Sequence, residues 1–255
     1  MHLLTLTKKT NISPLVFSVL LAVPLVALAG PPYETDDPDP TEYKHYEIFV
    51  ATEYHRSAEE RSGTFPNLEV NYGLMPDVQI GINTPIAFSQ IDNQNRHYGL
   101  GDIELSVKYR FIQETEVMPM VSFFPSYKSH TGNANKNLGN GESEYFLPIW
   151  LGKSWGDWTT YGGSGYTITQ EDNAKNSWFF GWLLQKQVTK HLNIGGEIFY
   201  KSEKSPDEGT STGFNLGGSY DFNERHHVVF SAGKGLKNVQ QTNQFSSFVA
   251  YLLTF

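Results

Sequence analysis

Apolar and polar residues alternate along most of the chain after residue 42, with the period of two residues that a β-strand requires. The clearest example is the stretch 102–111, in which each face is nearly pure. Its apolar face holds Ile103, Leu105, Val107, Tyr109 and Phe111, and its polar face holds Asp102, Glu104, Ser106, Lys108 and Arg110. In a soluble sandwich the apolar face would meet a protein core, whereas in a membrane barrel it would meet lipid and the charges would point into the lumen.

The same pattern recurs often enough to predict twelve strands. They lie near 44–54, 68–74, 78–83, 102–111, 118–127, 145–151, 158–168, 178–184, 192–201, 214–222, 227–234 and 245–255. Short turns near 75–77, 113–117, 155–158, 189–191 and 223–225 alternate with longer polar loops near 56–64, 88–99, 128–142, 169–176, 202–211 and 235–244. This alternation favours an all-β, transmembrane, antiparallel up-and-down barrel of about twelve strands, because a soluble exported β-sandwich has no reason for it.

Aromatic residues mark the two places where such a barrel would meet the membrane surface and the assembly machinery. Trp155, Trp158, Tyr72 and Phe222 lie near the short turns and predict an interfacial belt. The final segment, 245–255, ends on a free C-terminal phenylalanine and resembles the signal by which bacterial outer-membrane proteins are recognised for assembly. We therefore expect the barrel-assembly machinery as a partner, with Tyr251, Leu253 and Phe255 as the assembly signal.

The first residues predict export. Lys8 and Lys9 precede an apolar run at 14–28, and Ala27 and Ala29 form a small-residue cleavage site before Gly30. A membrane anchor is the alternative, but the run is shorter than the roughly 20 residues a spanning helix needs. The expected organisation is a signal peptide at 1–29, an extended acidic and proline-rich arm at 30–43, and an outer-membrane barrel at 44–255.

Composition narrows the possible partners. The chain has no cysteine, which excludes disulfides and a lipoprotein anchor. Its formal net charge is −8, and removal of Lys8 and Lys9 would make it about −10, so nucleic acid is not expected as a partner. The partners expected are outer-membrane lipid and a small solute of unknown identity.

The stretch 30–40 carries four prolines and four acids, and it can form neither a helix nor a ladder strand. It is either a periplasmic arm or an arm tucked into the barrel mouth. Asp36, Asp37 and Asp39 could hold a divalent cation, but a solvated acidic tail is the simpler interpretation.

Several stretches of the mature chain resemble a known family of exported, transporter-like barrel proteins of Gram-negative bacteria. These stretches are 30–40, 71–76, 98–111, 156–163, 178–185 and 211–221. The family is labelled after the MetA pathway of phenol degradation, the meta-cleavage pathway. The resemblance implies an outer-membrane barrel associated with transport and with aromatic-compound degradation, and it implies no catalytic or binding residue.

The motifs that could indicate catalysis have simpler explanations. Gly162-Gly163-Ser164-Gly165 lacks the spacing and the following helix of a nucleophile elbow, and small residues on a curved strand explain it better. His226 and His227 are expected to be a surface pair, because no third metal ligand lies nearby. We therefore expect no enzyme activity, no cofactor and no metal.

The lumen is the remaining candidate site. By alternation the inward charged residues are Glu69, Asp102, Glu104, Lys108, Arg110, Glu144, Glu197, Lys201 and Asp221. They would line a weakly cation-preferring path, or one for small neutral or aromatic solutes, crossed by passive diffusion. Two alternatives stay open: a closed structural barrel stiffened by ion pairs that stabilises the envelope, or an outer-membrane lipid-modifying hydrolase.

Overall fold

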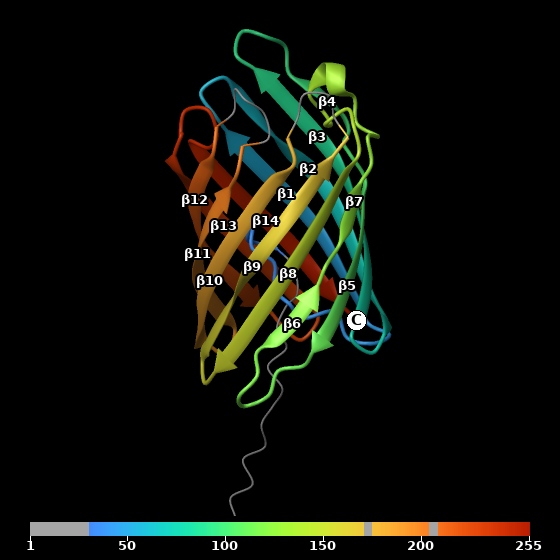
Figure 1. Cartoon of the computed structure of the whole chain (residues 1–255), viewed down its shortest axis with the longest axis vertical. Helices are drawn as coiled ribbons and strands as arrows, with labels where there is room; N and C mark the ends of the chain where they lie inside the picture. Colours follow the sequence, from blue (N-terminus) through green and yellow to red (C-terminus); the bar gives the residue numbers. More distant parts are fainter. Residues whose placement is uncertain (1–30, 171–174, 204–208) are drawn as a thin grey trace, which may run out of the picture.

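The computed structural model describes residues 31–170, 175–203 and 209–255 of the chain (Figure 1). Apart from one short 3-10 helix, all of its regular elements are strands. They are β1 (Tyr46–Arg56), β2 (Glu60–Met75), β3 (Val78–Ile91), β4 (His97–Leu100), β5 (Glu104–Ile112), β6 (Met120–Phe123), β7 (Ser126–Lys128), β8 (Glu144–Trp155), β9 (Trp158–Thr169), β10 (Ser177–Thr189), β11 (Leu192–Lys201), β12 (Ser211–Asp221), β13 (His226–Lys237) and β14 (Phe245–Thr254). The predicted signal peptide, 1–29, lies outside the described residues. Within those ranges no helix is long and apolar enough to cross a membrane.

The strands form one closed antiparallel sheet. Except at β4/β5 and β6/β7, each strand pairs with its neighbours in the chain, and β1 closes the ring by pairing with β14 from Glu47↔Thr254 to Arg56↔Phe245. β4 continues into β5, and β6 continues into β7, so the 14 strands make twelve crossings. Pro125 explains the second break, because proline cannot donate to the ladder. The predicted fold class, a barrel of about twelve strands, is confirmed.

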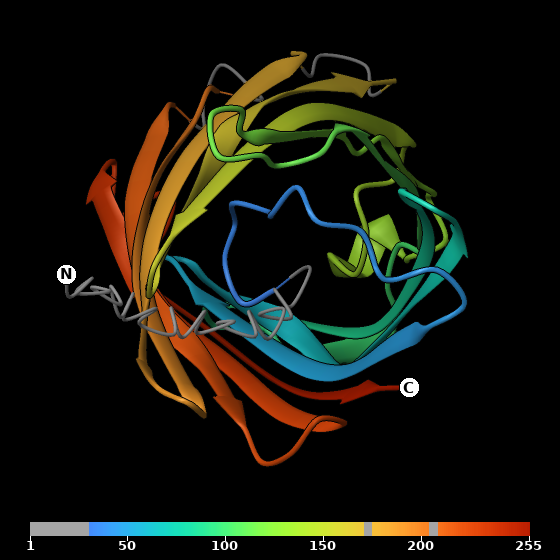
Figure 2. The ribbon, with the colours of Figure 1, turned by 90° about the horizontal axis from the view of Figure 1, so that it is seen from below.

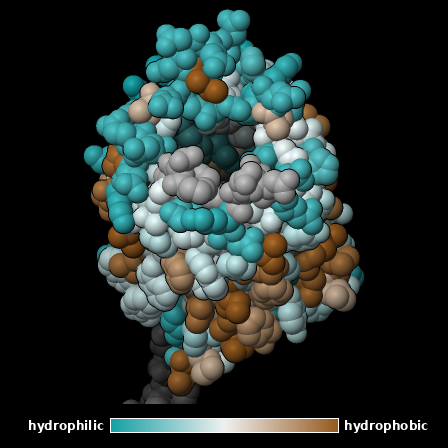
Figure 3. Space-filling view, turned by 45° about the horizontal axis from the view of Figure 1, so that its top comes forward, coloured by the Kyte–Doolittle hydropathy of each residue, from teal (hydrophilic) through white to brown (hydrophobic). Residues whose placement is uncertain are grey.

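The outer wall is apolar and the inner wall is largely polar. Leu105, Val107 and Tyr109 are about half exposed, while Lys108 between them is fully buried inside the barrel. Trp178, Phe180, Trp182 and Leu184 likewise face outward, as the alternation predicted. In Figure 3 hydrophobic residues gather on the wall away from the loops, and hydrophilic residues cover the loop end. This arrangement suits a wall that lipid surrounds.

Aromatic rings mark both ends of the apolar wall. At the short-turn end Tyr46 stacks near Tyr72 and Phe255, with ring centroids 4.5 and 5.4 Å apart. Trp155, Trp158 and Phe222 are exposed at the same end, where the predicted belt placed them. The C-terminal Phe255 is also tied to Tyr46 through backbone hydrogen bonds of 2.7 and 3.1 Å, which close the β1–β14 seam.

Two loops are shorter than the sequence predicted. β2 and β3 stay paired as far as Glu60↔Ile91, so the connections are 57–59 and 92–96 instead of 56–64 and 88–99. The sequence pattern shows a strand only where its outward residues are apolar. The pattern is lost where the β2–β3 hairpin extends beyond the apolar wall. Backbone pairing continues there without a hydrophobic signature.

We expect Val107→Arg to destabilise the folded barrel by about 2–4 kcal/mol, because it places a charge on the outer wall near mid-strand. Leu236→Arg, also outward but near the long-loop end, should cost about 0–1 kcal/mol. Equilibrium unfolding in lipid bilayers measures both values. Equal costs at the two positions would contradict this orientation of the barrel in the membrane.

Candidate functional site

The lumen of the barrel is occupied by the chain's own N-terminal arm, which we define as residues 31–43. Figure 2 shows this blue segment crossing the inside of the ring before it joins β1. It enters at the short-turn end, where Tyr43 forms a parallel bridge with Gly73 and the Lys44 amide donates to the Gly73 carbonyl at 2.8 Å. Thr35, Asp37 and Thr41 are at most 4% exposed. The arm is therefore a buried part of the barrel interior.

Lys108 from β5 is the centre of the arm's attachment. Its Nζ donates to Asp36 Oδ1 at 3.0 Å and to the Asp37 carbonyl at 2.9 Å, and it lies 3.7 Å from Asp37 Oδ1. The Phe124 ring lies 4.5 Å from the same ammonium. Arg110, two residues along the strand, pairs with Asp39 and with Asp77. Lys108 and Arg110 of the wall thus neutralise the acids of the arm. The prediction that the arm is a solvated acidic tail is wrong, because these two inward cations bind it.

The next contacts lie along the arm on either side of this centre. Near its base, the Thr41 amide donates to Gln79 Oε1 at 2.8 Å, and the Thr41 hydroxyl lies 2.9 Å from Glu47 Oε2. Toward its tip, the amides of Glu34 and Thr35 both donate to the Glu197 carboxylate at 2.8 Å. These side chains supply the hydrogen bonds that an arm of this composition cannot make within itself.

Glu34, near the tip of the arm, is held by side chains of the inner wall. Lys201 Nζ lies 2.9 Å from Glu34 Oε2, and Asn215 Nδ2 donates to Glu197 at 2.6 Å. Burial raises the pKa of Glu34, but Lys201, His55 and other cations outweigh burial and hold the pKa below its ordinary value. Glu34 is therefore ionised at neutral pH and adds to the attachment of the arm.

Glycines in the wall make room for the arm. A Cβ at Gly73 would lie 1.9 Å from the Glu42 carbonyl oxygen, and one at Gly152 would lie 2.6 Å from Pro38 Cγ. A Cβ at Gly181 would lie 2.1 Å from Thr35 Oγ1. The wall is thus shaped for the arm by three separate strands, β2, β8 and β10.

The short-turn half of the lumen is filled. Large side chains there are fully buried against the arm and one another, among them Trp150, Phe49, Leu183, Leu252 and Gln79. These side chains and the arm together narrow this half of the lumen.

The long-loop half holds a cavity of about 440 Å³, which we call the vestibule. Glu34 and Lys201 lie at its floor, and polar residues such as Glu60, Ser62 and Asn243 line its sides. Part of its wall is aromatic: Phe179 and Phe199 stack at 6.4 Å, and Phe146 meets Phe179 edge-on at 6.4 Å. Figure 3 shows the molecule hollowed between its loops at this end.

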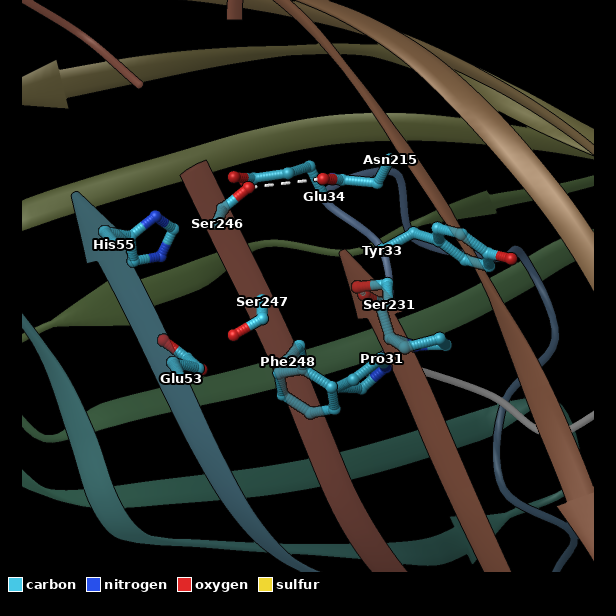
Figure 4. Close-up of a pocket in the computed structure, with 11 residues that line it drawn as sticks. Pro31, Tyr33, Glu34, Glu53, His55, Asn215, Ser231, Ser246, Ser247 and Phe248 are labelled. Carbon is cyan, nitrogen blue, oxygen red and sulfur yellow. Dashed lines mark hydrogen bonds between the residues drawn. The ribbon is translucent and has the colours of Figure 1, made fainter. Parts of the chain in front are cut away.

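A smaller cavity of about 150 Å³ lies beside the arm tip (Figure 4). Glu53 and His55 of β1 and Ser247 and Phe248 of β14 face the arm residues Pro31, Tyr33 and Glu34 across it. A third cavity, of about 140 Å³, lies on the opposite side of the arm tip beside Glu69 and Glu104. The tip is therefore loosely surrounded, whereas the base is tightly packed.

Asp102, which the sequence placed in the solute path, holds a loop instead. Its carboxylate accepts the Gly132 amide at 2.8 Å and the Asn140 amide at 2.7 Å. These bonds fold the loop between β7 and β8 inward, so that Leu138 is buried against the inward-facing Gly99 and Gly101. Asp102 thus shapes the mouth of the barrel without lining the vestibule.

The other predicted residues also lie on the inner wall, in separate groups. Lys108 and Arg110 hold the arm, and Glu197 and Lys201 hold its tip. Glu104 and Glu144 line a common cavity with Lys128, which lies 3.6 Å from Glu104. Glu69 accepts a hydrogen bond from Asn71 at 2.8 Å. Asp221 lies near the short turns and pairs with His227 at 2.8 Å, so it belongs to neither the vestibule nor the arm site.

Sequence reasoning missed the aromatic part of the lumen. Phe179, Phe199 and Trp150 are buried on the inner face, which the alternation rule assigned to polar residues. The sequence of 178–184 could have indicated these inward rings, because the stretch is apolar on both faces. A strand that is apolar on both faces is buried on both sides.

The motifs examined for catalysis have structural roles. Added Cβ atoms at Gly162, Gly163 and Gly165 would strike Trp182, Trp150 and Phe146, so small residues are needed against these rings. The expected surface pair of histidines is half wrong: His227 is 6% exposed and turned inward to Asp221, because the strand alternation begins at His226. Within the described ranges no group of three histidine, aspartate or glutamate side chains is placed to hold a metal.

Comparisons agree with this architecture. The model of the family described as "Putative MetA-pathway of phenol degradation" matches residues 63–253. The COG4313 outer membrane channel from Pseudomonas putida F1 is 14% identical, with a TM-score of 0.74 over 86% of this chain and 98% of that one. The NanC porin is 9% identical (TM-score 0.55, 82% and 98% covered), and the KdgM porin is 10% identical (0.53, 82% and 99%). No curated protein sequence matches the chain.

Lys108→Met should release the arm, because removing one partner of a buried ion pair leaves Asp36 and Asp37 uncompensated. Such a loss costs roughly 3–5 kcal/mol, so access to the arm should rise at least about a hundredfold. The chain has no cysteine, so a Thr35→Cys substitution reports access through its rate of reaction with a thiol reagent.

Lys153→Met is the matched control, because Lys153 pairs with Glu114 at 3.1 Å and does not touch the arm. Unchanged labelling in the Lys108→Met background would show that the ion pairs do not hold the arm.

Proposed function

The chain belongs to the family described as "Putative MetA-pathway of phenol degradation", and from that membership we propose that it is an outer-membrane channel for small solutes. The observation that carries the proposal is the vestibule, which opens among the long loops and ends on a non-covalent plug made by the arm. A barrel that served only as a structural element would need no such cavity. The apolar outer wall, the aromatic belt at the short-turn end and the fold shared with outer-membrane channels support an outer-membrane location.

Aromatic compounds are the solute class that the vestibule suits best. Phe146, Phe179 and Phe199 offer ring faces and edges, and aromatic pairs gain about 0.5–1.5 kcal/mol beyond the burial of their area. Lys201 and Glu34 lie beside these rings and can bind a polar substituent. A ring with one polar group therefore meets both kinds of wall at once.

Passage requires that the arm move. Polar contacts supply much of its attachment, and water can replace them. Lys44, with a φ of 68°, begins the connection to β1 and is the natural hinge.

An acidic lining gives the released path a weak preference for cations or neutral solutes. Glu34, Glu53, Glu69 and Glu104 line the cavities at the arm tip together with Lys201 and His55, and Glu144 and Lys128 line the adjoining cavity beside Glu104. Anions would meet a net negative field in this section.

A covalent clamp on the arm tests the mechanism. In the Thr35→Cys, Gly181→Cys variant the two cysteines stand at positions in direct contact, because a Cβ at Gly181 would lie 2.1 Å from Thr35 Oγ1. With a small shift of the arm to make room, we expect oxidation to join them and reduction to separate them. Conductance across a planar bilayer should fall to background when the bond forms and return on reduction. Each single substitution should respond to neither treatment. Undiminished conductance with the bond in place would show that solutes bypass the arm.

A second test addresses the solute class. Replacing Phe179 and Phe199 by asparagine should lower the ratio of phenylalanine to serine uptake into liposomes by about five- to tenfold, since two aromatic contacts are lost. Ser62→Asn, which lines the same cavity without a ring, is the control. An unchanged ratio would remove the aromatic preference from the proposal and leave a general pore.

A further inference from the structure

The outer surface of the barrel carries an unusual concentration of positive charge at its long-loop end. It begins with a row of outward aromatic rings on β14, β1, β3 and β4, namely Phe245, Tyr54, Phe88 and Tyr98, with Gly63 of β2 between Tyr54 and Phe88. Successive ring centroids are 6.2, 6.5 and 6.1 Å apart. This row marks the upper edge of the apolar wall, where lipid tails give way to headgroups.

Four cations lie directly at and above this row, and we call them the basic girdle: Arg56, Arg61, Arg96 and Lys234. Arg56 is paired in register with Phe245 on one side and with Arg61 on the other. Lys234 follows Gly233, which pairs with Ser246 next to Phe245. Arg96 lies over the Phe88 ring and donates to Gln90, the register partner of Arg61. The girdle therefore forms a continuous arc on the outside of β13, β14, β1, β2 and β3.

The girdle has no counter-charge in the described part of the protein. Arg56, Arg61 and Lys234 make no ion pair and no side-chain hydrogen bond with any described residue, and Arg96 bonds to neutral groups alone. Glu59 and Asp92 lie in the loops next to these strands, and no ion pair joins them to the girdle. Each of the four cations is exposed.

The pairing of Arg56 with Arg61 is the decisive feature. Residues directly opposite on antiparallel strands have Cβ atoms about 4.5–5.5 Å apart, and like charges there destabilise the sheet. An anion between the two guanidinium groups turns this repulsion into attraction. Phosphate suits the position best, because guanidinium groups bind its oxygens through paired hydrogen bonds.

We propose that the basic girdle binds the phosphate groups of the glycolipid that forms the outer leaflet of the outer membrane. The ligand is a membrane lipid because the girdle faces outward, at headgroup height, directly above a belt that lies at the membrane interface. The aromatic row would contact the lipid's upper chains and sugars while the four cations hold its phosphates. The inference rests on the proposed outer-membrane location and not on transport.

The test compares the purified full chain with its Arg56→Gln, Arg61→Gln variant in detergent. The probes are phosphorylated lipid A, the same lipid dephosphorylated, and inorganic phosphate, each titrated while bound lipid is counted by native mass spectrometry. We expect the variant to bind phosphorylated lipid A at least about tenfold more weakly than the parent. We expect Lys186→Gln, Lys190→Gln, at the short-turn end, to bind it like the parent.

The melting temperature gives a second readout, because the substitutions should change it in opposite directions without and with the lipid. Without phosphorylated lipid the Arg56→Gln, Arg61→Gln variant should melt higher than the parent, because the like-charge pair is gone. With the lipid it should melt lower. A variant that melted lower in both conditions would overturn the proposal, since the arginines would then have a purely structural role.

Two other results would also overturn it. Equal binding of phosphorylated and dephosphorylated lipid would show that phosphate is not recognised, and binding of inorganic phosphate as tight as that of the lipid would remove the lipid as the ligand. Conductance of the parent chain separates this proposal from the channel proposal. A parent that binds phosphorylated lipid A without conducting contradicts the channel proposal alone, and a parent that conducts without binding the lipid contradicts this proposal alone.

Discussion

The ion pairs between Lys108 and the arm hold the interior together. A fully buried ammonium inside a barrel is tolerated when carboxylates and carbonyls surround it, and here Asp36, Asp37 and their backbone provide that shell. The arm, in turn, is an extended acidic chain that cannot fold alone. Each part therefore makes the other stable: the wall orders the arm, and the arm neutralises the wall.

This dependence divides the lumen into two functional halves. Near the short turns the arm, its contacts with wall glycines and the large buried side chains occupy much of the lumen. Near the long loops the arm tip is surrounded by cavities, and the wall becomes partly aromatic. In the channel that we propose, a solute would bind in the vestibule before the arm moves, and the contact of Glu34 with Lys201 would join the solute site to the arm.

The sequence was sufficient for the architecture because alternation reports which face of a strand meets lipid. The stretch 102–111 shows this plainly, since each of its apolar residues faces outward and Lys108 and Arg110 face inward. The sequence was not sufficient to predict the interior of the barrel, because the N-terminal arm that fills it is distant in sequence from the strands that hold it. No local pattern joins Asp36 to Lys108 or Thr35 to Gly181, because their contacts depend on how the ring closes. Asp102 shows the same limit, since its inward position was predictable and its loop partners were not.

A charge next to a low-dielectric layer needs a partner of opposite charge, and this rule leads to different conclusions on the inner and outer sides of the barrel wall. Inside, the cations Lys108, Arg110 and Lys201 each face an acid supplied by the arm, so the charges are resolved within the chain. Outside, Arg56 and Arg61 face each other at the edge of a low-dielectric layer, and no described residue offsets them. A charge in such surroundings needs a partner, and where the protein does not supply one, its surroundings must. The distribution of paired and unpaired cations thus separates the groups that hold the plug from those that contact the membrane.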